Sequence, residues 1–111
     1  MNVKEYLMLC AIEELGEIAK EISKCMRFTP GHVAPEYGTS NVSRVEKEIA
    51  EFYAVIEMLK ENNIGIRAAP FHFNEEQVSE FLGKKMRLKA YMERSRELGT
   101  LQGKEHEPID H

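Results

Sequence analysis

The stretch from Val3 to Arg27, VKEYLMLCAIEELGEIAKEISKCMR, decides the fold class of this chain. Its apolar side chains recur every three or four residues and form one stripe of a helix, which consists of Met8, Ala11, Ile12, Leu15, Ile18, Ala19, Ile22 and Met26. Just before the stretch, Asn2 is followed three residues later by Glu5, which is a capping-box pattern. The sequence therefore predicts a long amphipathic helix over residues 3–27.

Two further stretches, residues 43–62 and 75–98, have the same helical period. Their apolar faces are Val45, Ile49, Phe52, Ile56 and Leu59 in the first, and Val78, Phe81, Leu82, Leu88 and Met92 in the second. Ser43 with Glu46 forms a capping box for the first of them, and Asn41 is an alternative cap. Asn74 with Gln77 caps the second, which Gly99 ends.

The predicted helices make one all-α domain over residues 1–99, followed by a polar tail at 100–111. The loop from Phe28 to Ser40 contains two Pro and two Gly, so we expect an ordered loop rather than a further element. Its length indicates that it covers something. The loop from Ile64 to Asn74 contains several apolar residues, so we expect it to pack on the helices. Three antiparallel helices of ~30–36 Å are too long to bury their stripes alone. We therefore expect a four-helix-type bundle completed by dimerisation, as a homodimer or a dimer of dimers.

Composition narrows the function classes. The 111 residues are 42% hydrophobic and 31% charged, and the chain has no apolar run of the ~18 residues that a membrane span needs. The net charge of −4 disfavours a stable nucleic-acid partner. Only two cysteines, Cys10 and Cys25, are present, which indicates a reducing, cytoplasmic location. Nearly all the acidic residues are Glu, a good helix former, in agreement with the all-α class.

Two Glu-x-x-Glu pairs, Glu14 with Glu17 and Glu48 with Glu51, lie near the middle of the first two predicted helices. Glu14 and Glu48 border their apolar stripes, whereas Glu17 faces inward only if another element covers the side of Leu7, Cys10 and Cys25. Partly buried carboxylates that face one another raise each other's pKa, and a divalent cation removes that cost. Carboxylates from two facing helices suit Mg²⁺, with Mn²⁺ as a substitute.

An alternative is that both pairs lie on solvated faces in ordinary ion pairs, such as Glu17 with Lys20, Arg44 with Glu48, or Lys47 with Glu51. Lys85, near the centre of the apolar face of residues 75–98, either extends its ammonium out to solvent or meets phosphates of a ligand. No spacing of His and Cys fits a structural zinc site, and no glycine-rich phosphate-binding loop is present.

The segment AIEELGEIAK at residues 11–20, followed by Lys24 and Arg27-Phe28, resembles the first helix of the MazG-like all-α nucleoside triphosphate pyrophosphohydrolases. The hallmark of that superfamily is Glu-Glu-x-x-Glu, a loop, and then Glu-x-x-Asp. Residues 13–17 match the first half, and residues 48–51 match the second except at the last position. The resemblance covers about residues 6–62, and a weaker similarity to small phage-type members continues through Lys84-Lys85 to Gly99.

This resemblance implies a function and a set of residue roles. The activity would be Mg²⁺-dependent hydrolysis of a nucleoside triphosphate to the monophosphate and pyrophosphate. The implied metal ligands are Glu14, Glu17, Glu48 and Glu51, the general base is Glu17 or Glu14, and the phosphate contacts are Lys24, Arg27 and Lys85. The base of the nucleotide would lie among loop residues, with Asn41, Phe28 and Tyr37 as candidates.

One departure from the hallmark concerns Glu51, which stands where the family has Asp and reaches one methylene further. Glu51 either binds the ion through water, holds the helices slightly further apart, or belongs to an inactive site. The alternative function is therefore a non-catalytic helical dimer that acts as an interaction or regulatory module.

Overall fold

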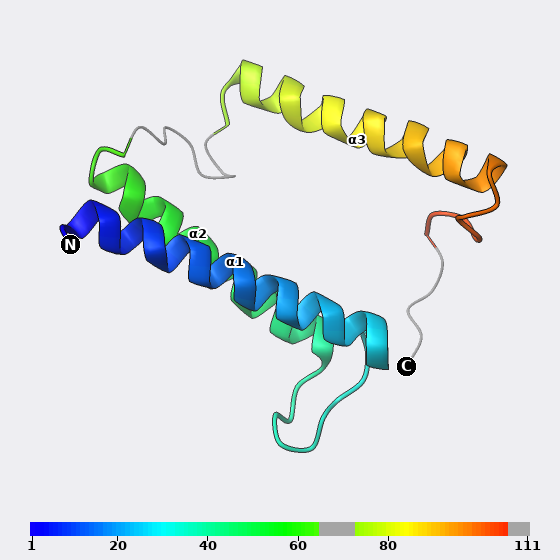
Figure 1. The fold of residues 1–111 in the computed structure, drawn as a ribbon, viewed down its shortest axis with the longest axis horizontal. Helices are drawn as coiled ribbons and strands as arrows, with labels where there is room; N and C mark the ends of the chain where they lie inside the picture. The colour runs from blue at the N-terminus through cyan, green and yellow to red at the C-terminus, as the bar shows by residue number, and fades with distance from the viewer. Residues whose placement is uncertain (65–72, 107–111) are drawn as a thin grey trace. The chain divides into compact units, whose positions relative to one another are not determined.

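The computed structural model of the chain describes residues 1–64 and 73–106. These residues form three helices, α1 (Val3–Phe28), α2 (Asn41–Glu61) and α3 (Glu75–Glu97), and within the described ranges there is no β-strand (Figure 1). The predicted all-α class is confirmed. The chain divides into two units, one with α1 and α2 and the other with α3, and each is described by itself.

α1 begins where the sequence predicts. The side-chain oxygen of Asn2 accepts a hydrogen bond of 2.8 Å from the backbone N–H of Glu5, which satisfies one of the free donors of the first turn. The helix ends at Thr29, whose N–H donates to the Cys25 carbonyl at 3.1 Å. Thr29 has a φ of 85°, which is unusual for a β-branched residue. The backbone is therefore strained at this helix end, where glycine is the common residue.

α2 begins two residues earlier than predicted, and neither Ser43 nor Asn41 is its cap. The N-cap is Ser40, whose hydroxyl oxygen accepts from the N–H of Ser43 at 3.2 Å. The cause is the preceding loop, in which the N–H groups of Asn41 and Val42 donate to the carbonyls of His32 and Pro30, each at 2.9 Å. These bonds satisfy donors that the cap would otherwise serve, so the helix starts directly at the loop.

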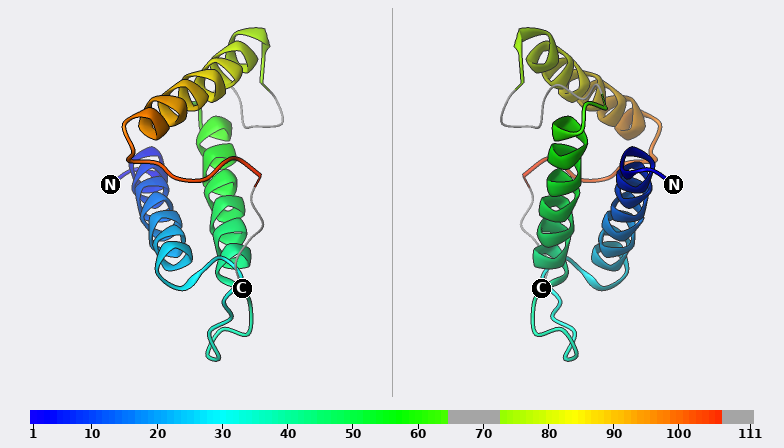
Figure 2. Two further views of the ribbon diagram at one scale, coloured as in Figure 1. Left: turned by 90° about the vertical axis from the view of Figure 1, so that its right-hand side faces the viewer. Right: turned by 90° about the vertical axis from the view of Figure 1, so that its left-hand side faces the viewer.

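α1 and α2 lie side by side and run antiparallel, joined by the loop of residues 29–40 (Figure 2). The two ends of this hairpin are buried differently. Leu7 and Leu59 are the buried apolar residues of the described chain, and both lie at the end away from the loop. At the loop end the buried residues are polar, namely Glu21 and Asn41. Polar groups buried this fully need partners, so the loop end is the place to search for a site.

The predicted apolar stripe of α1 does not form its buried face. Ile12, Leu15 and Met26 are 65%, 52% and 84% exposed, and Met8 and Ile22 are exposed as well. α1 turns toward α2 the side that contains Leu7 and Glu21, and Arg44 of α2 binds the Glu21 carboxylate there. The predicted apolar face of α2 agrees more closely with the observed burial, because Leu59 is buried and four further residues are half-buried, namely Val45, Ile49, Phe52 and Ile56.

In the second unit, α3 begins with the predicted capping box, in which Asn74 and Gln77 exchange backbone and side-chain hydrogen bonds at 2.9 and 3.0 Å. Gly99, with a φ of 77°, follows the end of α3, as expected. The start of the predicted tail is bonded to the last turn of the helix, because Thr100 and Leu101 donate their N–H groups to the Ser95 carbonyl.

Two expectations lie largely outside the described residues. They are the packing of the loop from Ile64 to Asn74, of which residues 65–72 are not described, and the final part of the tail, residues 107–111. The boundary of a single domain at residue 99 stays a prediction. Within the described ranges, no helix combines the length and the hydropathy needed to cross a membrane.

Candidate metal centre

Polar side chains on α1 and α2 follow one face of each helix. The spacing on both helices is three, four and three residues, which keeps side chains on one side of a helix with 3.6 residues per turn. These residues are Glu14, Glu17, Glu21 and Lys24 on α1, and Asn41, Arg44, Glu48 and Glu51 on α2. Because the helices run antiparallel, Glu14 lies opposite Glu48 and Glu51 at the same height along the helix pair. Glu21, Lys24 and Arg44 meet nearer the loop.

Three of the four predicted metal ligands come together. Glu14, Glu48 and Glu51 each offer one carboxylate oxygen, and these oxygens lie within 4.8 Å of one another. We call these three residues the carboxylate cluster. Glu14 and Glu48 are half-buried and Glu51 is exposed. Oε2 of Glu14 is fully buried and no described residue forms a hydrogen bond with it.

The electrostatics of the carboxylate cluster are unfavourable for its negative charges. Burial raises the pKa of Glu48 above its ordinary value, and so do a side-chain hydrogen bond with Glu51 and the charges of Glu51, Glu14 and Glu17. Within residues 1–64 and 73–106, no cation forms an ion pair with a member of the cluster. A hard divalent cation would compensate these charges, and oxygen atoms are the ligands that Mg²⁺ and Mn²⁺ prefer.

Glu17 is the predicted ligand that the structure leaves outside the carboxylate cluster. Its side chain is exposed, and its oxygens are not among those that lie within 4.8 Å of one another. It is nevertheless close enough for its charge to raise the pKa of Glu48. Glu17 therefore lies beside the cluster, in a position to contact a group bound there.

Next to the carboxylate cluster, Glu21 binds two cations. Its oxygens accept hydrogen bonds of 3.0 Å from both Nε and Nη2 of Arg44, and Lys24 Nζ lies 3.4 Å from Oε1. We call Glu21, Lys24 and Arg44 the ion-pair network. The hydrogen bonds from Arg44 lower the pKa of Glu21 against the opposing effect of burial, and the same bonds raise the pKa of Arg44. This fork-to-carboxylate geometry is the strong form of an ion pair.

The ion-pair network also fixes the loop. The Arg44 guanidinium carbon lies 3.6 Å from the centre of the Tyr37 ring, and Lys24 Nζ lies 4.9 Å from it. These are cation–π distances, so Tyr37 of the loop is held against both helices.

The ion pairs of the alternative hypothesis do not form among the described residues. Glu17 with Lys20, Arg44 with Glu48 and Lys47 with Glu51 are all absent there. Arg44 binds Glu21 instead, although the charge of Glu48 still acts on it and helps to raise its pKa. Arg44 is therefore the member of the ion-pair network that the charge of the carboxylate cluster also affects.

The predicted phosphate and base contacts lie in three places. Lys24 and Asn41 are at the loop end of the hairpin, where Asn41 is 2% exposed. Arg27 is exposed and its guanidinium lies 5.3 Å from the ring centre of Phe28. Lys85 belongs to α3, in the other unit, and its ammonium lies 5.9 Å from the ring centre of Phe81.

Comparison of the chain with protein-family models, with curated proteins and with solved structures finds no match in any of the three. The functional interpretation therefore depends on the residues and their geometry.

Proposed function

We propose that this protein is an Mg²⁺-dependent nucleoside triphosphate pyrophosphohydrolase, which cleaves a (d)NTP to the (d)NMP and pyrophosphate. The observation that carries the proposal is the carboxylate cluster, three acidic side chains from two helices with oxygens within 4.8 Å of one another. The buried, unpartnered Oε2 of Glu14 supports it, because such an oxygen is costly without a ligand. The resemblance of residues 6–62 to MazG-like enzymes supplies the reaction.

Glu14, Glu48 and Glu51 would hold the ion, with Mn²⁺ as a substitute for Mg²⁺. When bound, the ion would neutralise phosphate charge and lower the pKa of a water molecule. Glu17, exposed beside the cluster on the same face as Glu14, would accept the proton of the attacking water. Glu14 is the second candidate for this role, as the resemblance implies.

The cations beside the cluster support a substrate with phosphates. Arg44 lies within electrostatic reach of Glu48, and Lys24 is held next to Arg44 through their shared partner Glu21. A phosphate chain that reaches the ion would lie close to this positive charge. Arg27 and Lys85 stay candidate phosphate contacts. The base of the nucleotide would then lie toward the loop, near Asn41.

A second candidate function is a non-catalytic helical dimer, an interaction or regulatory module. It is favoured by the exposed apolar stripe of α1, which includes Ile12, Leu15, Ile22 and Met26. The same stripe supports dimerisation of the enzyme, as a homodimer or a dimer of dimers completing a four-helix-type bundle. Light scattering at micromolar concentration tests the assembly, and a monomeric mass would contradict it.

The decisive experiment is a panel of common dNTPs and NTPs, assayed for pyrophosphate release with and without Mg²⁺. We expect the wild-type protein to release pyrophosphate from at least one of them, and Glu48→Gln to lose at least about 100-fold of that activity. The matched control is Glu46→Gln, an exposed carboxylate of α2 two residues before Glu48, which should keep the activity. If the wild-type protein releases pyrophosphate from none of the panel, the proposed enzyme function is wrong.

Metal binding can be tested without substrate. Mg²⁺ or Mn²⁺ should raise the melting temperature of the wild-type protein, because the ion binds only the folded arrangement of the three carboxylates. Glu46→Gln should show the same rise and Glu48→Gln should show little of it. An equal rise in all three proteins would place the ion elsewhere.

A further inference from the structure

The guanidinium of Arg44 is held along one edge and on one face. Its Nε and Nη2 each donate a hydrogen bond of 3.0 Å to the Glu21 carboxylate. The ring of Tyr37 covers one face, with the guanidinium carbon 3.6 Å from the ring centre. A guanidinium has five N–H groups, so three of them form no hydrogen bond within the part of the chain that the structure describes. These three belong to Nη1 and Nη2 and make up the second edge of the fork.

The charges beside Arg44 leave an excess of one positive charge. Glu21 is 1% exposed and binds both Arg44 and Lys24. No other acidic group in residues 1–64 and 73–106 forms an ion pair with either cation. The side chains of Arg44 and Lys24 are 20% and 16% exposed, so a solute can reach the cations although it cannot reach Glu21. An anion bound there would balance the excess charge.

This excess charge lies one helical turn from the carboxylate cluster. Arg44 and Glu48 are four residues apart on α2, which makes them neighbours on the helix surface, with ~5–6 Å between their Cβ atoms. The charge of Glu48 acts on Arg44 and helps to raise its pKa. One turn of α2 therefore has an excess of negative charge and the next an excess of positive charge. A divalent cation that carries a phosphate chain presents the two opposite charges side by side.

Resting on the proposed function, we propose that Arg44 binds the phosphate chain of the nucleotide through its second edge, and that Glu21 and Tyr37 are positioning residues that hold this edge in place. Arg44 is not among the phosphate contacts that the resemblance implies. Arginine pairs with phosphate through two parallel N–H···O bonds, which are strong because both partners are charged. Since the side chain is already held on two sides, it loses little further conformational freedom when phosphate binds.

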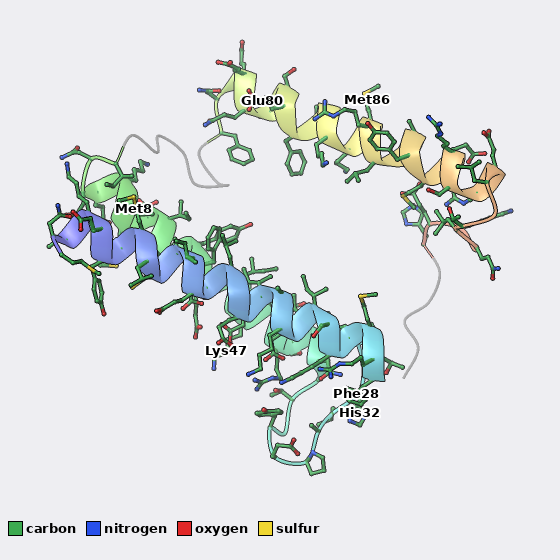
Figure 3. All side chains as sticks on the ribbon, in the orientation of Figure 1. Met8, Phe28, His32, Lys47, Glu80 and Met86 are labelled. Atoms are coloured by element: carbon green, nitrogen blue, oxygen red, sulfur yellow. The ribbon has the colours of Figure 1, made fainter. Side chains whose placement is uncertain are left out.

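The experiment measures the binding of inorganic pyrophosphate in the presence of Mg²⁺ by calorimetric titration. Arg44→Lys keeps the positive charge but lacks the fork. We expect its affinity for pyrophosphate to be at least about tenfold lower than that of the wild-type protein. The control is Lys47→Gln, at an exposed lysine of α2 three residues from Arg44 (Figure 3). Although this change removes a whole charge, the affinity should stay within about twofold of the wild-type value, because an exposed charge contributes little.

Tyr37 distinguishes positioning from general folding. Tyr37→Leu removes the ring that covers the guanidinium, and we expect the affinity for pyrophosphate to fall at least about threefold. Tyr37→Phe keeps the ring and should bind pyrophosphate as the wild-type protein does. Mg²⁺ should raise the melting temperature of Arg44→Lys and of both Tyr37 variants as much as that of the wild-type protein, because none of these changes alters the carboxylate cluster.

Three results would overturn the assignment of Arg44. They are equal affinity of Arg44→Lys and the wild-type protein, an equal loss in Lys47→Gln, and no binding of pyrophosphate by the wild-type protein. If Arg44→Lys does not fold, the double variant Glu21→Leu with Arg44→Met replaces it, because removing both partners of a buried pair leaves no unpaired charge. Wild-type affinity in that variant would overturn the assignment, and a loss of at least about tenfold supports it.

The proposed function fails separately. If the nucleotide panel releases pyrophosphate and Arg44→Lys binds pyrophosphate as the wild-type protein does, the pyrophosphohydrolase stands and the role of Arg44 is wrong. If no nucleotide is cleaved but Arg44→Lys loses the affinity for pyrophosphate, the phosphate contact stands and the proposed reaction is wrong.

Discussion

The carboxylate cluster and the ion-pair network are built from the same two helices and the same residue type, but their charges are balanced differently. In the network, Glu21 is 1% exposed and has Arg44 at 3.0 Å and Lys24 at 3.4 Å. In the cluster, the described residues provide no ion pair for any of three carboxylates. The pKa of Glu21 is lowered accordingly, and that of Glu48 is raised.

This difference separates a structural carboxylate from one available to a ligand. Glu14 and Glu21 are seven residues apart on α1, so they share a helix face and have equal helix propensity. They differ in their partners on α2. Glu21 meets the cation Arg44, whereas Glu14 meets two further carboxylates, those of Glu48 and Glu51. Among the described residues, the chain supplies cations for the carboxylate nearer the loop and none for the carboxylate cluster.

The largest effect on stability is expected from Glu21→Gln. The change removes the charged acceptor of two hydrogen bonds in a nearly fully buried position. We expect the free energy of unfolding at pH 7 to fall by about 2 kcal/mol, as is typical for hydrogen bonds to charged groups. Urea denaturation measures this. Glu13→Gln, at an exposed carboxylate, should stay within about 0.5 kcal/mol of the wild-type protein, and an equal loss in both variants would contradict the assignment.

The contribution of the Glu21 charge to stability can also be tested by changing the pH. Folding lowers the pKa of Glu21 from its ordinary value of 4.5 because Arg44 holds the charged form. The stability that ionised Glu21 contributes is therefore complete above that ordinary value and is lost as the pH falls through the lower folded pKa. The difference in unfolding free energy between the wild-type protein and Glu21→Gln should shrink between pH 6 and pH 3. A difference that stays constant over this range would show that the charge of Glu21 is not its source.

The helices could be predicted because their signals are local. Asn2 with Glu5 and Asn74 with Gln77 are three residues apart, and both caps form as expected. The start of α2 was predicted wrongly because it depends on carbonyls of Pro30 and His32, about ten residues earlier in a loop. A spacing rule that considers one helix at a time does not include hydrogen bonds to a distant loop.

The site shows the same division between local and distant contacts. Spacing found Glu14, Glu48 and Glu51, which the structure brings together. It missed the bond between Glu21 and Arg44, because these residues are 23 positions apart and their pairing depends on how the two helices are rotated. Which side of α1 faces α2 depends on the same distant contacts. Most of the apolar stripe of α1 is exposed in the single chain, and the side that faces α2 includes Glu21, which binds Arg44.

A smaller effect is expected at the strained turn that follows α1. Thr29 has a φ of 85°, and strain of this kind costs about 1–3 kcal/mol in a β-branched residue. Thr29→Gly should relieve it, and after the extra chain entropy of glycine the free energy of unfolding should rise by about 1 kcal/mol. Thr39→Gly, in the same loop but without positive φ, should give no rise. A loss of stability in Thr29→Gly would mean that the threonine side chain makes a favourable contact that outweighs the strain.

The smallest expected change is the one that distinguishes the two regions most directly. Glu48→Gln should raise the stability of the metal-free protein by roughly 0.5 kcal/mol, because it removes a like-charge pair with Glu51 one helical turn away. Glu21→Gln and Glu48→Gln are the same chemical change on facing helices, so opposite changes in the free energy of unfolding would follow from charge balance alone. Denaturation in the presence of EDTA measures the change for each variant. With Mg²⁺, Glu48→Gln should become less stable than the wild-type protein, because only the wild-type cluster gains stability from the ion. A destabilised Glu48→Gln protein in EDTA would mean that Glu48 is a structural residue like Glu21, and the carboxylate cluster would then lose its main support as a metal centre.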